Sequence, residues 1–349
     1  MTTSTPALLP DERLVKTSRL TRILRRPELG ALMGAIVIYA LFAAFDKTGN
    51  FASIAGTARW TDVAANVGIV AVPVALLMIA GEFDLSAGVM VGTSGLLAGL
   101  LMTEYHWGVW PAIVATFAFA ACIGLANGWL VALTGLPSFI VTLAMFFSLR
   151  GLNLGVTKLL TDTVRVAGVD KAPGYESAQA VFSSTFWAPN DFRISLIWWL
   201  AITVIATWVL TRTKWGNWIY ASGGDKVAAR NVGVPVRRTK ITGFVLTSTA
   251  ACLVGIMSLL RLKSMQAGQG VGEEFTFIIA AVVGGTLLTG GYGSAIGASI
   301  GASIIGMAFI GIAYAGWNTD WTWLFLGIIL FIAVLVNTYI GRRAQGARK

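Results

Sequence analysis

Charged side chains are scarce in this chain of 349 residues. Asp, Glu, Lys and Arg make up 12% of the sequence, whereas 56% of the residues are hydrophobic. A soluble domain carries about 25% charged residues, so this chain lacks the charge to cover a globule of its size. A disordered chain is excluded too, because it would be polar and rich in charge. The composition therefore predicts an integral membrane protein.

Residues that build metal sites and disulfide frameworks are also few. The sequence has one histidine, His106, and two cysteines, Cys122 and Cys252, both within apolar runs. These residues give neither a disulfide framework nor a metal-ligand spacing. The dipeptide Gly-Lys never occurs, which excludes a P-loop for ATP. We therefore predict that the chain is not an enzyme and holds no metal and no cofactor of its own.

Long hydrophobic runs are what the sequence does contain. A helix that crosses a bilayer core needs about 20 mostly apolar residues. Ten windows approach this length: Leu29–Phe45, Val63–Ala80, Ala87–Met102, Val109–Leu133, Pro137–Val156, Ile194–Leu210, Ile241–Leu260, Phe275–Gly290, Ser294–Ala315 and Thr322–Ile340. They predict an all-α polytopic membrane protein with about ten transmembrane helices, the first of them an uncleaved span.

Basic residues gather in three segments. Even numbers of predicted spans separate these segments, so all three lie on the same side of the membrane. Residues 1–28 hold six Lys and Arg, residues 211–240 hold seven, and residues 341–349 hold four. Because cytoplasmic flanks carry the excess of Lys and Arg, we expect both terminal tails and the 211–240 loop to be cytoplasmic. Helices one to six then occupy residues 29–210, with an external segment at 157–193, and helices seven to ten occupy residues 241–340. The net charge of +10 therefore indicates contact with membrane lipid and not with nucleic acid.

A polar stretch separates the second apolar run from the third. Residues 81–88 read GEFDLSAG and contain Glu82, Asp84 and Ser86. Ionisable residues at membrane depth are costly and usually face a cavity or a partner. One interpretation is a substrate pathway in which these side chains bind a hydroxylated solute, or lock a hinge. The other is a short cytoplasmic turn that caps the next helix. Asn127, in the fourth run, is a further pathway candidate, although bonding between helices is its more common use.

The cytoplasmic loop contains the signature of a short helix. Asp225 is suited to cap a helix over residues 226–231, which Gly233 and Pro235 would end. A short helix on a membrane face can dock into a groove of a partner protein. The alternative is a basic loop that contacts lipid headgroups.

Glycines bracket the eighth apolar run on both sides. The glycines that we assign to a gate or to close packing are Gly284, Gly285, Gly290, Gly291 and Gly293. They suit a broken helix near a gate, or else a flexible connector. Glu273 and Glu274 precede this run, and we expect them at the outer surface near Arg261 and Lys263.

At these three stretches the sequence resembles the ribose-type, monosaccharide-transporting permease subunits of binding-protein-dependent bacterial ABC importers. Residues 80–88, AGEFDLSAG, resemble the family's Gly-Gly-Ile-Asp-Leu-Ser-Val-Gly signature. Residues 216–230, GNWIYASGGDKVAAR, resemble its cytoplasmic loop, and residues 284–293 its late glycine block. The chain departs from the family at Glu82, where glycine is usual, at Asn217 for arginine and at Asp225 for asparagine.

The resemblance implies a type II importer-like fold and a set of partners. It implies a second permease chain, identical or paralogous, a cytoplasmic ABC ATPase that binds ATP-Mg, and an extracytoplasmic sugar-binding protein. The location would be the bacterial inner membrane, with both termini cytoplasmic, and the solute a monosaccharide or polyol. Coupling to the ATPase would fall on the short helix and its flanks: Gly223, Asp225, Ala228, Ala229, Arg230 and Gly233.

Two alternatives remain open at this point. A permease of the related branched-chain amino acid branch would need charged groups for a zwitterion, and Glu82 and Asp84 are the candidates. A secondary transporter that works alone would carry ion-coupling acids within its spans.

Overall fold

The computed structural model describes residues 27–346, and side chains for residues 28–335. Of the predicted tails, residues 1–26 and 347–349 lie outside these limits, whereas the backbone of residues 341–346 continues the last helix. The long helices are α2 (Pro27–Phe45), α3 (Ile54–Ile79), α4 (Ser86–Thr103), α5 (Val109–Thr134), α6 (Ser138–Thr161), α8 (Ser195–Arg212), α11 (Val236–Leu262), α13 (Ala295–Tyr314) and α14 (Thr322–Gly346). Within the described residues, eight of them, all but α14, are long and apolar enough to cross a membrane.

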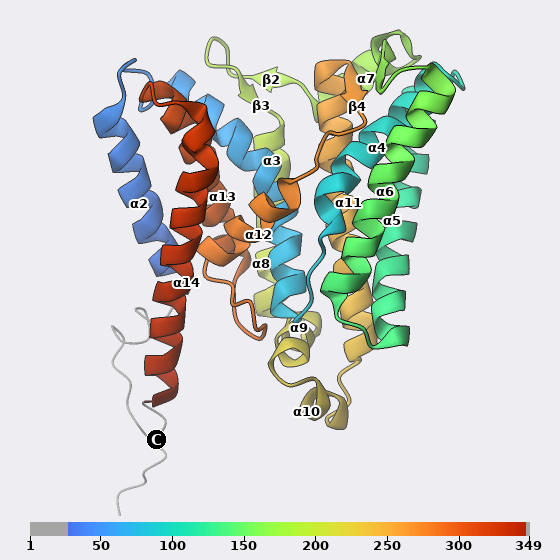
Figure 1. The fold of residues 1–349 in the computed structure, drawn as a ribbon. Coiled ribbons are helices and arrows are strands. Elements are labelled where there is room, and N and C mark those ends of the chain that lie inside the picture. The colour runs from blue at the N-terminus through green and yellow to red at the C-terminus, as the bar shows by residue number, and fades with distance from the viewer. Residues whose placement is uncertain (1–26, 347–349) are drawn as a thin grey trace, which may run out of the picture.

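Shorter elements lie at the two ends of this bundle and in its interior. The short helices are η1 (Val169–Lys171), α7 (Tyr175–Phe182), α9 (Lys214–Gly224), α10 (Lys226–Asn231), α12 (Glu273–Val283) and η2 (Thr319–Trp321). Two antiparallel pairs are formed by β1 (Arg165–Ala167) with β4 (Ser264–Gln266), and by β2 (Thr185–Phe186) with β3 (Phe192–Arg193). Figure 1 places α7 and both strand pairs at one end of the bundle, and α9 and α10 at the other. We call these the outer and the inner end.

The core is formed by α3, α4, α11 and α13, which are apolar around most of their surfaces. Helix α3 packs on α13, and α11 packs on both α4 and α5. Close approach depends on glycine: a Cβ at Gly124 or Gly128 of α5 would overlap the backbone of α11, and one at Gly301 of α13 would overlap that of α12. Without a hydrophobic driving force between helices in lipid, such backbone contact stabilises the bundle. Helices α2, α5, α6 and α8 have exposed apolar faces at its periphery.

The predicted helices are confirmed, with one correction in the eighth run. This run was counted as a span over residues 275–290, but α12 ends at Val283 and has 11 residues, about 16 Å at 1.5 Å per residue. Of the two interpretations of its flanking glycines, the structure agrees with the broken helix. The backbone leaves the helix at Gly285, which has φ of +92°. Figure 1 shows that non-helical chain on both sides of α12 completes the passage from β4 to the inner end.

Helix α3 begins nine residues earlier than the apolar run, at Ile54. Its first turns include Arg59 and Asp62, whose side chains find partners at the outer end: Arg59 donates to the Tyr314 hydroxyl, and Asp62 pairs with Arg261. Polar residues are therefore accommodated within the helix, because other helices supply their partners.

Candidate functional site

The segment between α3 and α4 is extended chain held inside the bundle. Its backbone N–H groups at Phe83 and Leu85 donate to the hydroxyls of Ser138, at 3.0 Å, and Thr142, at 3.1 Å, both on α6. Non-helical backbone at membrane depth persists only where such partners satisfy it. Serine and threonine on α6 therefore allow α3 and α4 to be two separate helices.

Asp84 lies at the centre of a buried hydrogen-bond network. Its side chain is 1% exposed. Oδ1 accepts from the backbone N–H of Ser86 at 2.9 Å and from its hydroxyl at 2.6 Å, and Oδ2 accepts from the Thr247 hydroxyl at 2.7 Å. The Asn127 amide donates to the Ser86 hydroxyl at 2.9 Å. The structure thus brings together three of the four predicted pathway residues, and their contacts join α4, α5 and α11.

Glu82 lies apart from this network. Its carboxylate forms an ion pair with Lys240 near the start of α11, and both side chains are largely buried. It also lines a cavity of about 510 Å³ at the inner end of the bundle. Buried ion pairs of this kind stabilise little by themselves, but breaking one leaves an uncompensated charge.

The chain around α12 is the second broken segment, and it packs directly against glycines of α4, which follows the first broken segment. A Cβ at Gly88 or Gly92 of α4 would overlap the backbone at Gly270 and Gln269, in the run of turns before α12. Glu274 packs against Gly88 and is 4% exposed. The prediction that Glu274 lies at the outer surface is therefore wrong.

The basic residues expected beside Glu273 and Glu274 have other partners. Arg261 pairs with Asp62 at 2.7 Å and Lys263 with Asp170 at 3.4 Å. The reason is geometric. Helix α12 begins on the inner side of β4, so its first turn lies within the bundle and not at the outer surface.

Three chain segments meet on glycine at the inner end. The N–H of Gly291 donates to the Ile79 carbonyl at the end of α3, at 2.8 Å. Gly223 of α9 packs against both groups, and a Cβ there would overlap the Ile79 carbonyl oxygen. Gly81 and Gly290 complete the contact, each with positive φ. We call these residues the glycine junction; it includes two of the five predicted gate glycines.

The remaining gate glycines pack elsewhere. Gly284 lies against Gly297 of α13, and Gly293 lies against Thr286 and Ile79. Gly285 provides the turn after α12, with φ of +92°.

The short helix predicted from the sequence is confirmed as α10. Asp225 precedes it and accepts from the N–H groups of Val227 at 2.9 Å and Ala228 at 3.0 Å. Gly233 follows with φ of +82°. Ala229 faces the bundle, whereas Val227 and Val232 are 59% and 79% exposed. The helix therefore presents apolar side chains away from the bundle.

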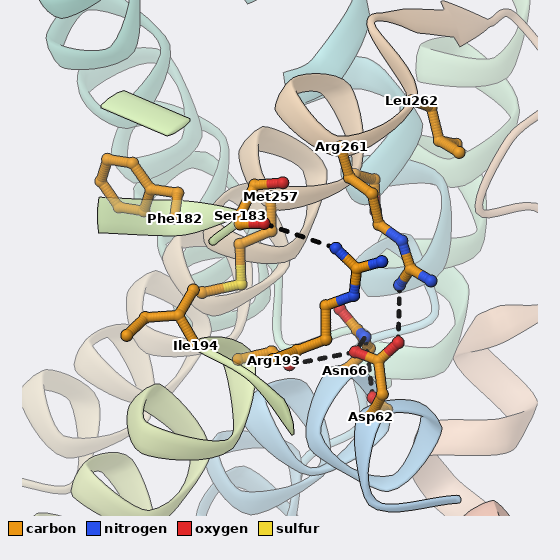
Figure 2. A pocket seen from close by; sticks show the side chains of 11 residues that line it. Asp62, Asn66, Phe182, Ser183, Arg193, Ile194, Met257, Arg261 and Leu262 are labelled. Atoms are coloured by element: carbon orange, nitrogen blue, oxygen red, sulfur yellow. Dashed lines mark hydrogen bonds and ion pairs between the residues drawn. The ribbon is translucent and has the colours of Figure 1, made fainter. Parts of the chain in front are cut away.

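A polar pocket at the outer end was not predicted. Its volume is about 200 Å³, and α3, α11 and the chain before α8 line it. Figure 2 shows Arg261 and Asn66 directed at Asp62, while Arg193 reaches the Ser183 carbonyl. One sequence signal was available: Asp62 and Asn66 lie one turn apart on one face of a helix.

These features define the class of protein. The chain is a polytopic helical membrane protein with two broken segments that meet at one end, beside a short exposed helix. Such broken helices are a common construction for transport sites. No group of three His, Cys, Asp or Glu that could hold a metal occurs among the described residues.

The chain belongs to the family described as the permease component of the branched-chain amino acid transport system, which it matches over residues 56–334. It is therefore a transmembrane permease component of an ABC importer and not a catalytic subunit. The predicted family, type II fold class and lack of enzymatic activity are confirmed.

Several curated proteins are similar over most of the chain. The xylose transport system permease protein of Escherichia coli is 28% identical, over 90% of this chain and 92% of the relative. The fructose import permease protein of Rhizobium meliloti is 30% identical, over 80% and 77%. The ribose import permease protein of Escherichia coli is 29% identical, over 89% and 93%. No solved structure matches significantly.

Proposed function

We propose that this chain forms one half of the pathway of an ATP-driven importer for a monosaccharide or polyol. The names of three relatives specify xylose, fructose and ribose, and this agreement supports the solute class. The importer lies in the bacterial inner membrane with both termini cytoplasmic, which the Lys and Arg distribution supports. A sugar-binding protein delivers the solute from outside.

The observation that carries the proposal is the connection between α10 and the two broken segments. Helix α9 leads directly into α10, and Gly223 of α9 packs against the end of α3 and against the chain before α13. A partner that moves α10 therefore moves the segment that contacts both broken elements. The exposed Val227 and Val232 are the surface that we assign to the ATPase.

The second permease chain is assigned to the exposed face of α6. Leu152 and Leu159 are exposed there, and a Cβ added at Gly151 or Gly155 would meet no other atom within 4 Å. The glycine pairs of α4 and α5 are, in contrast, covered by other segments of the chain. Glycine pairs in membrane helices favour close helix association, so an uncovered pair supports a partner chain.

The test is reconstitution in proteoliposomes with an ABC ATPase and a sugar-binding protein from the same organism. We expect ATP-dependent uptake of xylose, ribose or fructose. The variant Val232→Asp is expected to abolish co-purification of the ATPase and uptake together. The matched control is Val164→Asp, an exposed valine at the outer end, which should leave co-purification intact. Uptake that survives ATP depletion but is abolished by an ionophore would instead identify a secondary transporter.

A second candidate function, branched-chain amino acid import, is favoured by the outer pocket. Asp62 and Arg193 supply opposite charges, and Phe182, Met257 and Leu262 supply apolar surface, which together suit a zwitterion with an apolar side chain. Direct transport decides between the candidates: ATP-dependent uptake of labelled leucine, without uptake of labelled sugar, is expected only if this second function is correct.

A further inference from the structure

Basic residues converge on the cavity at the inner end, which we call the inner cavity. It measures about 510 Å³ and lies between α9, α10, α11, the segment after α3 and the loop between α5 and α6. Its basic lining residues are Lys226, Arg230, Arg237 and Lys240, and its acidic one is Glu82. Clefts lined by one sign of charge concentrate counter-ions.

The positive charge of the inner cavity is mostly uncompensated. Glu82 pairs with Lys240. Within residues 28–335, none of the ion pairs involves Lys226, Arg230 or Arg237. The excess of basic residues on cytoplasmic loops explains why lysine and arginine occur on this side. It does not explain why residues of α10 and of α11 line the same cavity.

A buried hydroxyl without a partner lines the same cavity. Ser222 is 2% exposed, and its Oγ has no hydrogen-bond partner. Leaving a buried polar group unpaired costs about 1–3 kcal/mol, so a hydroxyl of this kind at a cavity has a free-energy gain available from any acceptor that reaches it. Ser222 can donate to an anion that the neighbouring guanidinium groups attract.

We propose that the inner cavity binds a phosphate monoester, held by Arg230 of α10 and Arg237 of α11 with Ser222 as a hydroxyl donor. Guanidinium groups bind phosphate oxygens through paired hydrogen bonds. Because the two arginines belong to different helices, a bound phosphate connects α10 to α11 and restrains their relative movement. The phosphate group belongs either to a soluble sugar phosphate or to a lipid headgroup.

Binding is measured on the full chain in nanodiscs of zwitterionic lipid, by calorimetry with ribose 5-phosphate and inorganic phosphate, and with urea as the uncharged control. We expect Arg230→Gln and Arg237→Gln each to weaken phosphate binding about tenfold. Arg238→Gln, a neighbouring basic residue of α11 outside the cavity, should change affinity less than about twofold. Glu82→Gln should tighten binding, because it removes a like charge and releases Lys240.

The sign of the Glu82→Gln effect separates an anion site from a structural ion pair, since a merely structural role would not strengthen binding. A second arm uses nanodiscs that contain phosphatidylglycerol. Tighter retention of this lipid by the native chain than by the Arg230→Gln, Arg237→Gln double variant identifies a lipid source. Binding of the sugar phosphate without that difference in lipid retention identifies a soluble source of the phosphate group.

The proposal is overturned if the native chain binds neither the sugar phosphate nor the lipid. It is also overturned if the double variant, shown to be folded by its melting temperature, binds both ligands as well as the native chain does. Because the readout is binding and not uptake, failure here leaves the proposed transport function untouched.

Discussion

The N–H of Gly291 donates to the carbonyl oxygen of Ile79 across 2.8 Å, although 212 positions separate the two residues along the chain. This bond connects the end of α3 to the chain before α13, so that the two broken segments are joined at the inner end of the bundle. Gly223 lies against both of its partners. We therefore expect movement of α9 to reach both segments through backbone contact, without a flexible side chain between them.

Replacing Gly223 with alanine is expected to disrupt this junction. Its Cβ would overlap the Ile79 carbonyl, and overpacking of this kind costs about 1–3 kcal/mol. Uptake should fall strongly while binding of the ATPase persists. The adjacent Gly224→Ala is the matched control, because a Cβ there has nothing within 4 Å. Equal uptake by the two variants would contradict the role of the junction.

The network around Asp84 predicts a stability effect from Thr247. Thr247→Val removes the donor to a buried carboxylate oxygen, which costs about 1–3 kcal/mol. Thr249→Val is the control, because the Thr249 hydroxyl donates only within α11, to Val245 and Leu246. Thermal unfolding in detergent measures both variants.

The same variants distinguish a lock from a solute contact. If Asp84 and its partners hold the helices together, Thr247→Val lowers the melting temperature and leaves the KM of uptake unchanged. A raised KM at native stability would show that the network contacts the solute instead.

Asp225 is expected to act through its cap of α10. Asp225→Ala removes the one carboxylate oxygen, Oδ1, that accepts from two N–H groups, and destabilises the helix by about 1 kcal/mol. We expect weaker ATPase co-purification from this variant. Asp225→Asn retains a capping side chain and should retain the partner. Loss with both variants would indicate that the negative charge, and not the cap, is required.

Tyr175 of α7 gives a prediction for alkaline pH. Burial raises the pKa of this phenol above its ordinary value of 10.0, and the negative charge of Asp170 adds to the effect. The folded state therefore holds this proton more tightly than the unfolded state. The stabilisation is complete below pH 10.0 and is lost as the pH rises through the folded pKa.

Tyr175→Phe should remove this pH dependence. It also removes the hydrogen bond from the Tyr175 hydroxyl to the Leu260 carbonyl, at 2.6 Å, at a cost of about 1 kcal/mol at neutral pH. Ultraviolet titration of the phenolate, together with melting temperatures from neutral to alkaline pH, tests both expectations. An unchanged alkaline profile in the variant would assign the dependence to another group.

Much of the site was predictable because its signals are local. Asp225, the six-residue helix and Gly233 follow one another in the chain, so capping rules alone located α10. Burial of Glu274 was not predictable, because it depends on where α12 begins relative to β4. The outer pocket was missed for the same reason, since Asp62 and Arg261 are 199 residues apart.

The sequence by itself determined that the chain is a helical membrane protein, where most of its helices lie and which family it belongs to, because hydrophobic length and local motifs are properties of neighbouring residues. Tertiary structure decided which helix is too short to cross the membrane and which glycines face backbone. It also decided that Glu82 and Asp84, two positions apart, belong to separate clusters. These outcomes depend on distant segments packing together, and in lipid that packing is governed by shape and hydrogen bonding between helices.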